Sequence, residues 1–81
     1  MEHIGNHGIT LGEAEYVVDH ARRPYPQRLG EGKYLAVGQA SAGKYIQVVY
    51  VFDPPGVVFV IHARPLTERE KHRLRRRRRG T

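Results

Sequence analysis

Residues 33–65 read KYLAVGQASAGKYIQVVYVFDPPGVVFVIHARP, and this stretch decides the fold. It holds three runs rich in Val, Ile, Tyr and Phe, at 33–40, 44–52 and 57–64, a composition typical of β-strands. Ser41-Ala42-Gly43 and Asp53-Pro54-Pro55-Gly56 separate the runs, and both connections have the length of hairpin loops. We therefore expect a three-stranded antiparallel meander.

The two connections also predict how the strands pair. The first, counted as a three-residue turn, places Val37 opposite Gln47 and Gln39 opposite Tyr45. The second, counted as a four-residue turn, places Gln47 opposite His62. Side chains alternate between the faces of a sheet, so this register defines two faces. One face is almost wholly apolar and is expected to form the core; it comprises Tyr34, Ala36, Gly38, Ile46, Val48, Tyr50, Phe52, Val57, Phe59, Ile61 and Ala63.

The other face of this sheet is divided into two ends. Its apolar end comprises Leu35, Val49, Val51, Val58 and Val60, and its polar end comprises Gln39, Tyr45, Gln47, His62 and Arg64. The apolar end needs a cover, and a C-terminal helix bearing Leu66 and Leu74 is available for it. The polar end, beside the start of that helix, is the candidate site.

Two capping boxes predict where the helices begin. Thr10 and Glu13 have the spacing of the first, and a helix over 11–19 would bury Leu11, Ala14, Val17 and Val18. Residues 3–7 are expected to add one more helical turn, and residues 20–32, with Pro24 and Pro26, to form a loop. Thr67 and Glu70 form the second capping box, so a basic helix should follow it.

Positive charge is concentrated at the C-terminal end of the chain. The 81 residues carry 14 Lys and Arg against eight Asp and Glu, a net charge of +6, and residues 69–79 alone hold seven Arg and one Lys. Such a segment favours RNA or an acidic protein as partner. We divide the chain into one compact α+β domain, residues 1–74, and a basic tail, residues 75–81, which has no apolar stripe.

Several classes of site are excluded or disfavoured by composition. The chain has no cysteine, which excludes disulfides, thiolate catalysis and cysteine zinc sites. His3 and His7 have the i, i+4 spacing of a metal pair, but no third ligand accompanies them, so we expect no metal. No apolar run approaches the roughly 20 residues of a membrane span, so we expect a cytoplasmic protein that does not enter a membrane.

His62 and Arg64 are the residues of the polar end that best suit chemistry on a phosphate. They share one face of a strand, about 7 Å apart by strand rise. Arginine binds phosphate with two parallel hydrogen bonds, and histidine transfers protons near neutral pH. The alternative is structural: both would be ordinary strand-end residues, with Arg64 anchoring the last helix through Glu70.

The order of short motifs along the chain resembles the BrnT family of toxins from type II toxin–antitoxin systems. The motifs are Glu2-His3-Ile4, His7-Gly8-Ile9-Thr10, Glu13-Ala14-Glu15, Tyr34-Leu35-Ala36-Val37-Gly38 and Ala63-Arg64-Pro65-Leu66-Thr67 with Glu70. The resemblance implies a small ribonuclease with a RelE-like fold. It also implies a BrnA-like antitoxin partner, a ribbon-helix-helix protein.

Carried over by position, the motifs of the family fall partly on residues already singled out and partly on residues elsewhere in the chain. The Lys-His-Gly motif falls on Asn6-His7-Gly8, the Ser-Ala-Arg motif on His62-Ala63-Arg64, the basic residue of the first long strand on Lys33, and the helix glutamate on Glu70. Asn6 and Leu74 depart from the family, which has a basic and an aromatic residue there.

Together, these observations predict an endoribonuclease that works without metal or cofactor. The 2′-hydroxyl of RNA is the nucleophile, and the protein supplies a base, an acid and positive charge. Arg64 would stabilise charge, His62 or Glu70 would be the base and His7 the acid. The expected RNA-binding residues are Lys33, Tyr45, Gln47, Arg69 and Arg73. The alternative is a basic module that binds RNA, DNA or an acidic protein without cleaving anything.

Overall fold

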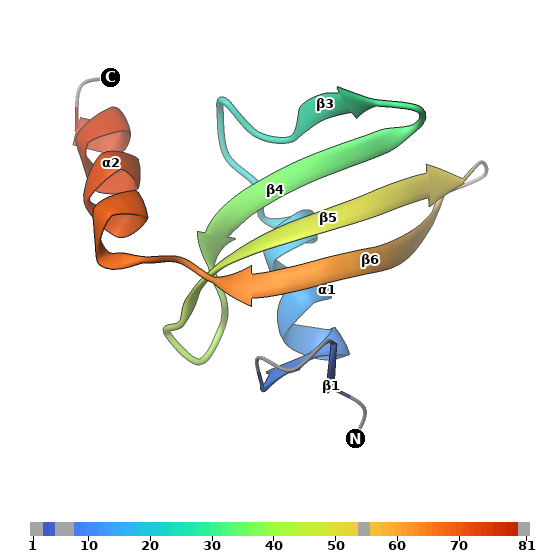
Figure 1. The fold of residues 1–81 in the computed structure, drawn as a ribbon, viewed down its shortest axis with the longest axis horizontal. Helices are drawn as coiled ribbons and strands as arrows, with labels where there is room; N and C mark the ends of the chain where they lie inside the picture. Colours follow the sequence, from blue (N-terminus) through green and yellow to red (C-terminus); the bar gives the residue numbers. More distant parts are fainter. Residues whose placement is uncertain (1–2, 5–7, 54–55, 80–81) are drawn as a thin grey trace.

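The computed structural model describes residues 3–4, 8–53 and 56–79, and within them the chain folds as α+β (Figure 1). The elements in chain order are β1 (His3–Ile4), β2 (Ile9–Thr10), α1 (Leu11–Asp19), β3 (Gln27–Gly30), β4 (Lys33–Gln39), β5 (Tyr45–Asp53), β6 (Val57–Pro65) and α2 (Glu68–Arg79). The α+β class expected from the sequence is confirmed. The helix α2 continues through Arg79, and so includes most of the segment assigned to a basic tail.

The main sheet has four antiparallel strands in the order β3-β4-β5-β6, so the prediction of three was wrong. The additional strand, β3, lies in the segment predicted to be a loop, because both prolines precede Gln27 and leave the following residues able to pair. Gly30 and Gly32 have φ values of 91° and 76°, which allow the tight turn into β4.

A second, two-stranded sheet occupies the N-terminal segment. There β1 pairs antiparallel with β2, with His3 opposite Thr10 and Ile4 opposite Ile9. The helical turn expected over residues 3–7 is therefore wrong for His3 and Ile4, while residues 5–7 lie outside the described part of the chain.

The helix α1 covers one face of the main sheet, where it contacts β4, β5 and β6 (Figure 1). It begins at the predicted capping box: the Glu13 N–H donates to the Thr10 hydroxyl, and the Thr10 N–H donates to the Glu13 carboxylate. Ala14 and Val17 are buried, whereas Leu11 is exposed and does not join the predicted stripe. The core under α1 comprises Ile9, Ala14, Val17, Ala36, Ala40, Ile46, Val48, Tyr50 and Ala63.

The predicted pairing is right for one hairpin and wrong for the other. Between β4 and β5, Val37 lies opposite Gln47 as expected. Between β5 and β6, Gln47 lies opposite Arg64 rather than His62. Two irregularities cause the difference. The pairing of Asp53 with Val57 leaves a turn of only three residues, and a bulge at Ile61 of β6 lies between the pairs Tyr50–Val60 and Val49–His62.

Because of these two irregularities, the side chains in the first half of β6 lie on the opposite face of the sheet from the predicted one. The shorter turn moves Val58 and Val60 against the core, while Val57, Phe59 and Ile61, predicted to be core residues, are exposed. The bulge then moves the register by one further residue. Because two shifts of one residue cancel in a pattern of period two, Arg64 remains on the predicted face and Ala63 in the core.

The helix α2 stands at one end of the sheet rather than over the apolar part of its open face (Figure 1). Leu66 and Leu74 are buried with Val37, and the half-buried Leu35 and Tyr45 pack against them. The helix therefore lies beside the polar end of the face, which corrects the expectation that it would cover the apolar end. No helix in the described ranges is long and apolar enough to cross a membrane.

Candidate functional site

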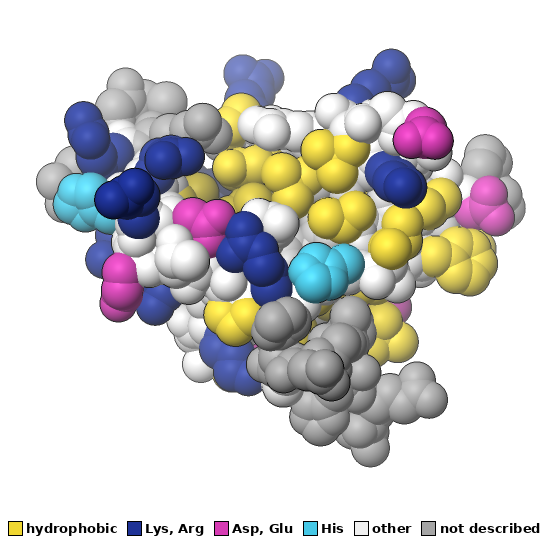
Figure 2. Space-filling view, in the orientation of Figure 1, with side chains coloured by type: hydrophobic (Ala, Val, Ile, Leu, Met, Phe, Trp, Pro, Cys, Tyr) yellow, Lys and Arg dark blue, Asp and Glu magenta, His cyan; other side chains and the backbone are white. Residues whose placement is uncertain are grey.

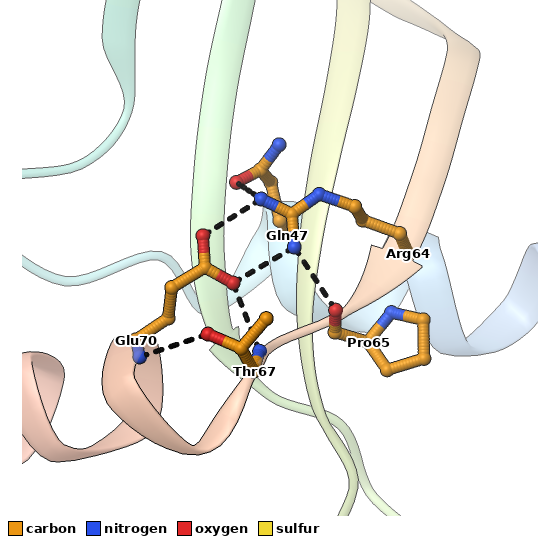
Figure 3. Close-up of polar contacts among 5 residues, drawn as sticks. All are labelled: Gln47, Arg64, Pro65, Thr67 and Glu70. Atoms are coloured by element: carbon orange, nitrogen blue, oxygen red, sulfur yellow. Dashed lines mark hydrogen bonds and ion pairs between the residues drawn. The ribbon is translucent and has the colours of Figure 1, made fainter.

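Arg64 is the centre of a polar network where β6 ends (Figure 3). Its guanidinium donates from Nη1 to Glu70 Oε1 at 2.8 Å and from Nη2 to Glu70 Oε2 at 2.7 Å. Nη2 also donates to Gln47 Oε1 at 3.1 Å, and Nη1 to the Pro65 carbonyl at 3.1 Å. Three elements, β5, β6 and α2, thus meet on one side chain, which fixes its orientation.

Glu70 is held from both sides. The predicted capping box is present, with the Glu70 N–H donating to the Thr67 hydroxyl at 3.2 Å and the Thr67 N–H donating to Glu70 Oε1 at 2.9 Å. The Arg64 guanidinium, and then the Thr67 N–H, lower the pKa of the Glu70 carboxyl from 4.5 to about 2. In return, the hydrogen bonds to Glu70 raise the pKa of Arg64. A carboxylate of such low pKa is a weak base, which favours His62 over Glu70 for proton removal.

The Arg64–Glu70 ion pair joins two elements of the fold and is partly accessible to solvent. Both side chains are about one third exposed, at 30% for Arg64 and 31% for Glu70. The two parallel hydrogen bonds join the start of α2 to the sheet, which is the structural alternative considered for Arg64. A ligand phosphate that reached this guanidinium would have to compete with the Glu70 carboxylate.

The low pKa of Glu70 predicts an acid-sensitive stability. Its pKa is lower in the folded chain than in the unfolded one, so the stabilisation is complete above about pH 4.5 and declines as the pH falls toward 2. Wild type should therefore lose more free energy of unfolding than Glu70→Gln between about pH 6 and about pH 2, as measured by urea denaturation. Other carboxylates, Glu13 included, titrate in both proteins and cancel in the comparison. Equal losses would show that the pair adds nothing to stability.

A hollow opens between α2 and the sheet, next to the ion pair. Its volume is about 170 Å³, and both apolar and polar side chains line it: Tyr25, Leu35, Val37, Gln47, Leu66, Glu70, Arg73 and Leu74. Gln47 and Arg73 were predicted RNA-binding residues. Tyr25 was missed, although an aromatic residue between Pro24 and Pro26 is a signal that a loop packs against the body of the protein.

Two of the remaining predicted residues, His62 and Tyr45, border the polar network. His62 lies exposed on β6, opposite Val49 and two positions before Arg64 on the same face. Tyr45 is half-buried, and the Arg75 guanidinium lies 5.4 Å from its ring centre, so α2 covers the ring expected to stack on a base. Both residues thus border the site, but only His62 presents its side chain to solvent.

Lys33 does not join this group. It lies opposite Val51, four residues along β4 from Val37, which is about 13 Å by strand rise. Arg69 and Arg73 are exposed on α2. His7, the predicted acid, lies outside the described residues. Within the described ranges, no group of three or more His, Asp and Glu side chains is placed to hold a metal ion.

No protein-family model, curated protein or solved structure matches this chain.

Proposed function

We propose that this protein is a metal-independent endoribonuclease toxin of a type II toxin–antitoxin system, neutralised by a BrnA-like antitoxin. The observation that carries the proposal is the position of His62, beside an oriented arginine and next to a strongly basic helix. The helix α2 holds eight Lys and Arg against two Glu, and the rest of the chain holds six of each. The entire net charge of the protein therefore lies in α2, next to the site.

The proposed reaction uses the nucleophile that RNA itself carries. His62 removes the proton of a 2′-hydroxyl, the 2′ oxygen attacks the adjacent phosphorus, and the bond from phosphorus to the 5′ oxygen breaks as that oxygen gains a proton. The products are a 2′,3′-cyclic phosphate and a 5′-hydroxyl. Arg64 stabilises the negative charge that develops on the phosphoryl oxygens, while Arg69 and Arg73 hold the RNA backbone.

A non-catalytic binding module is the second candidate, and the Arg64–Glu70 pair favours it. Both terminal nitrogens of the guanidinium bind the Glu70 carboxylate, so the positive charge of Arg64 is neutralised in the folded chain. In that case Arg64 would hold the helix in place, and α2 alone would bind RNA, DNA or an acidic protein.

Incubation of the purified protein with RNA and a chelator separates the two candidates. Cleavage that yields 2′,3′-cyclic phosphate ends supports the ribonuclease, whereas retained binding without cleavage supports the module. Growth gives a second readout: expression alone should slow the host, and co-expression of a ribbon-helix-helix protein encoded beside this chain should restore growth. Unimpaired growth at high soluble expression would contradict the toxin.

The double variant Arg69→Gln/Arg73→Gln should bind single-stranded RNA more weakly and with less dependence on salt. Each lost phosphate contact reduces the slope of log K against log salt by about 0.7, so we expect a slope smaller by about 1.4. Filter binding at several salt concentrations measures it. The matched control is Arg22→Gln/Arg23→Gln, which removes the same charge from exposed positions after α1. Equal effects of the two pairs would mean that only net charge matters and that α2 is not the RNA-binding element.

A further inference from the structure

The face of the main sheet opposite α1 presents an apolar surface to solvent. Figure 2 shows these side chains gathered over β4, β5 and β6. Phe59 is 54% exposed and Ile61 49% exposed, and the half-buried Leu35, Val49 and Val51 lie on the neighbouring strands. We call these five residues the open apolar face. Contiguous apolar surface of this kind is typical of an interaction site.

The open apolar face is a consequence of the irregular β5–β6 hairpin and of the position of α2. The short turn directs Phe59 away from the core, and the bulge at Ile61 leaves that side chain exposed as well. Since α2 packs on Val37 and Tyr45 at the end of the sheet, it covers only the margin at Leu35. Among the described residues, no element lies over Phe59 and Ile61.

Charge is distributed unequally around this face (Figure 2). At the α2 end the basic side chains predominate, with Arg69 and Arg73 exposed. At the opposite end, Lys33 is accompanied by Glu31 and Asp53, so that end is mixed in sign. A complementary ligand is therefore apolar over the strands and acidic toward α2.

We propose that the open apolar face binds an amphipathic helix of a protein partner, whose apolar side lies on the strands and whose acidic residues face α2. A helix is the element that normally covers an apolar sheet face, as α1 does on the other side. This inference goes beyond RNA cleavage and does not depend on it.

The charges disfavour the other occupants of the face. A second copy of this chain would add another α2 with the same net charge of +6 to the assembly. RNA would neutralise the positive charge of α2, but it would leave the aliphatic side chains of Leu35, Val49 and Val51 against a polar backbone. Only a ligand with both an apolar and an acidic part matches the two halves of the surface.

The test is selection from a displayed library of random helical peptides against the whole chain. Phe59→Thr/Ile61→Thr removes the apolar centre, and Phe52→Thr is the matched control. Phe52 is equally exposed at 50% but lies opposite Val58, which packs against the α1 core. Thr suits strands, and all three positions are exposed, so the variants should fold.

The selected peptides should carry apolar residues at i, i+3, i+4 and i+7 and a cluster of Asp or Glu at one end. Their affinity should fall about tenfold or more in Phe59→Thr/Ile61→Thr, and remain unchanged in Phe52→Thr. Three results would overturn the proposal: no enrichment, peptides that bind the double variant as well as wild type, or apolar peptides without acidic residues. Sedimentation that shows a dimer of the chain, lost in the double variant, would assign the face to a second copy instead.

Discussion

Replacing His62 with glutamine should lower the rate of RNA cleavage by about 100-fold or more, because a positioned general base contributes roughly 10²- to 10⁴-fold. Glutamine can still form hydrogen bonds, but it cannot accept a proton near neutral pH. His62 is exposed, so the substitution should cost much less stability than a substitution in the core. Single-turnover cleavage of a short RNA measures the rate, and urea denaturation the stability.

The matched control for this experiment is His72→Gln. His72 is also exposed, but it lies on α2 rather than on β6, and its loss should leave cleavage unchanged. Cleavage at the wild-type rate by folded His62→Gln would remove His62 from the mechanism. Equal losses in both variants would mean that histidine acts through RNA binding rather than proton transfer.

The sequence was informative wherever local chemistry decides structure. Both capping boxes form as predicted, because the Thr-x-x-Glu spacing satisfies backbone N–H groups within four residues. The β4–β5 pairing is also as predicted, since the length of a short turn sets the register of the strands that it joins. These features depend on neighbouring residues and do not require knowledge of the packed fold.

Features that depend on tertiary packing were predicted less well. A bulge at Ile61 leaves no signature in a run of Val, Phe and Ile, because all of these residues suit either face of a strand. The strand Gln27–Gly30 exists because β4 offers an edge for pairing, and its own sequence is that of a loop. For the same reason, the position of α2 could not be read from Leu66 and Leu74 alone, since both ends of the face offer apolar contacts.

The candidate site was predicted in its location and less fully in its contacts. Alternation along β6 placed His62 and Arg64 on one face, and this is the face that was predicted, because the two register shifts before them cancel. The capping box placed Glu70 one helical turn after Thr67, where it reaches Arg64. Spacing predicted the cap and raised the contact with Arg64, but it could not show that the guanidinium binds both oxygens of the carboxylate that also caps the helix.

The variant Arg64→Ala tests whether the arginine serves catalysis, the anchoring of α2, or both. Arg64→Ala removes four hydrogen bonds and leaves Glu70 without its cation. Since the pair is partly solvated, we expect a loss of about 1–2 kcal/mol in the free energy of unfolding. For a domain of this size that corresponds to a decrease of roughly 4–16 °C in Tm. If Arg64 also stabilises the charge on the phosphoryl oxygens, the cleavage rate should fall by about 100-fold or more.

Two further variants separate catalysis from anchoring. Arg64→Lys keeps the charge but loses the planar fork, so it should restore little of the cleavage rate. Glu70→Gln keeps the side chain that caps α2, since glutamine also serves in a capping box, and it removes the negative charge that neutralises Arg64. This variant should lose stability and yet bind RNA several-fold more tightly, because the guanidinium charge becomes available to a phosphate. Thermal denaturation and filter binding measure the two effects on the same samples. A Glu70→Gln protein that is less stable and binds RNA no better would assign Arg64 to anchoring alone, and full cleavage by folded Arg64→Ala would exclude it from the reaction.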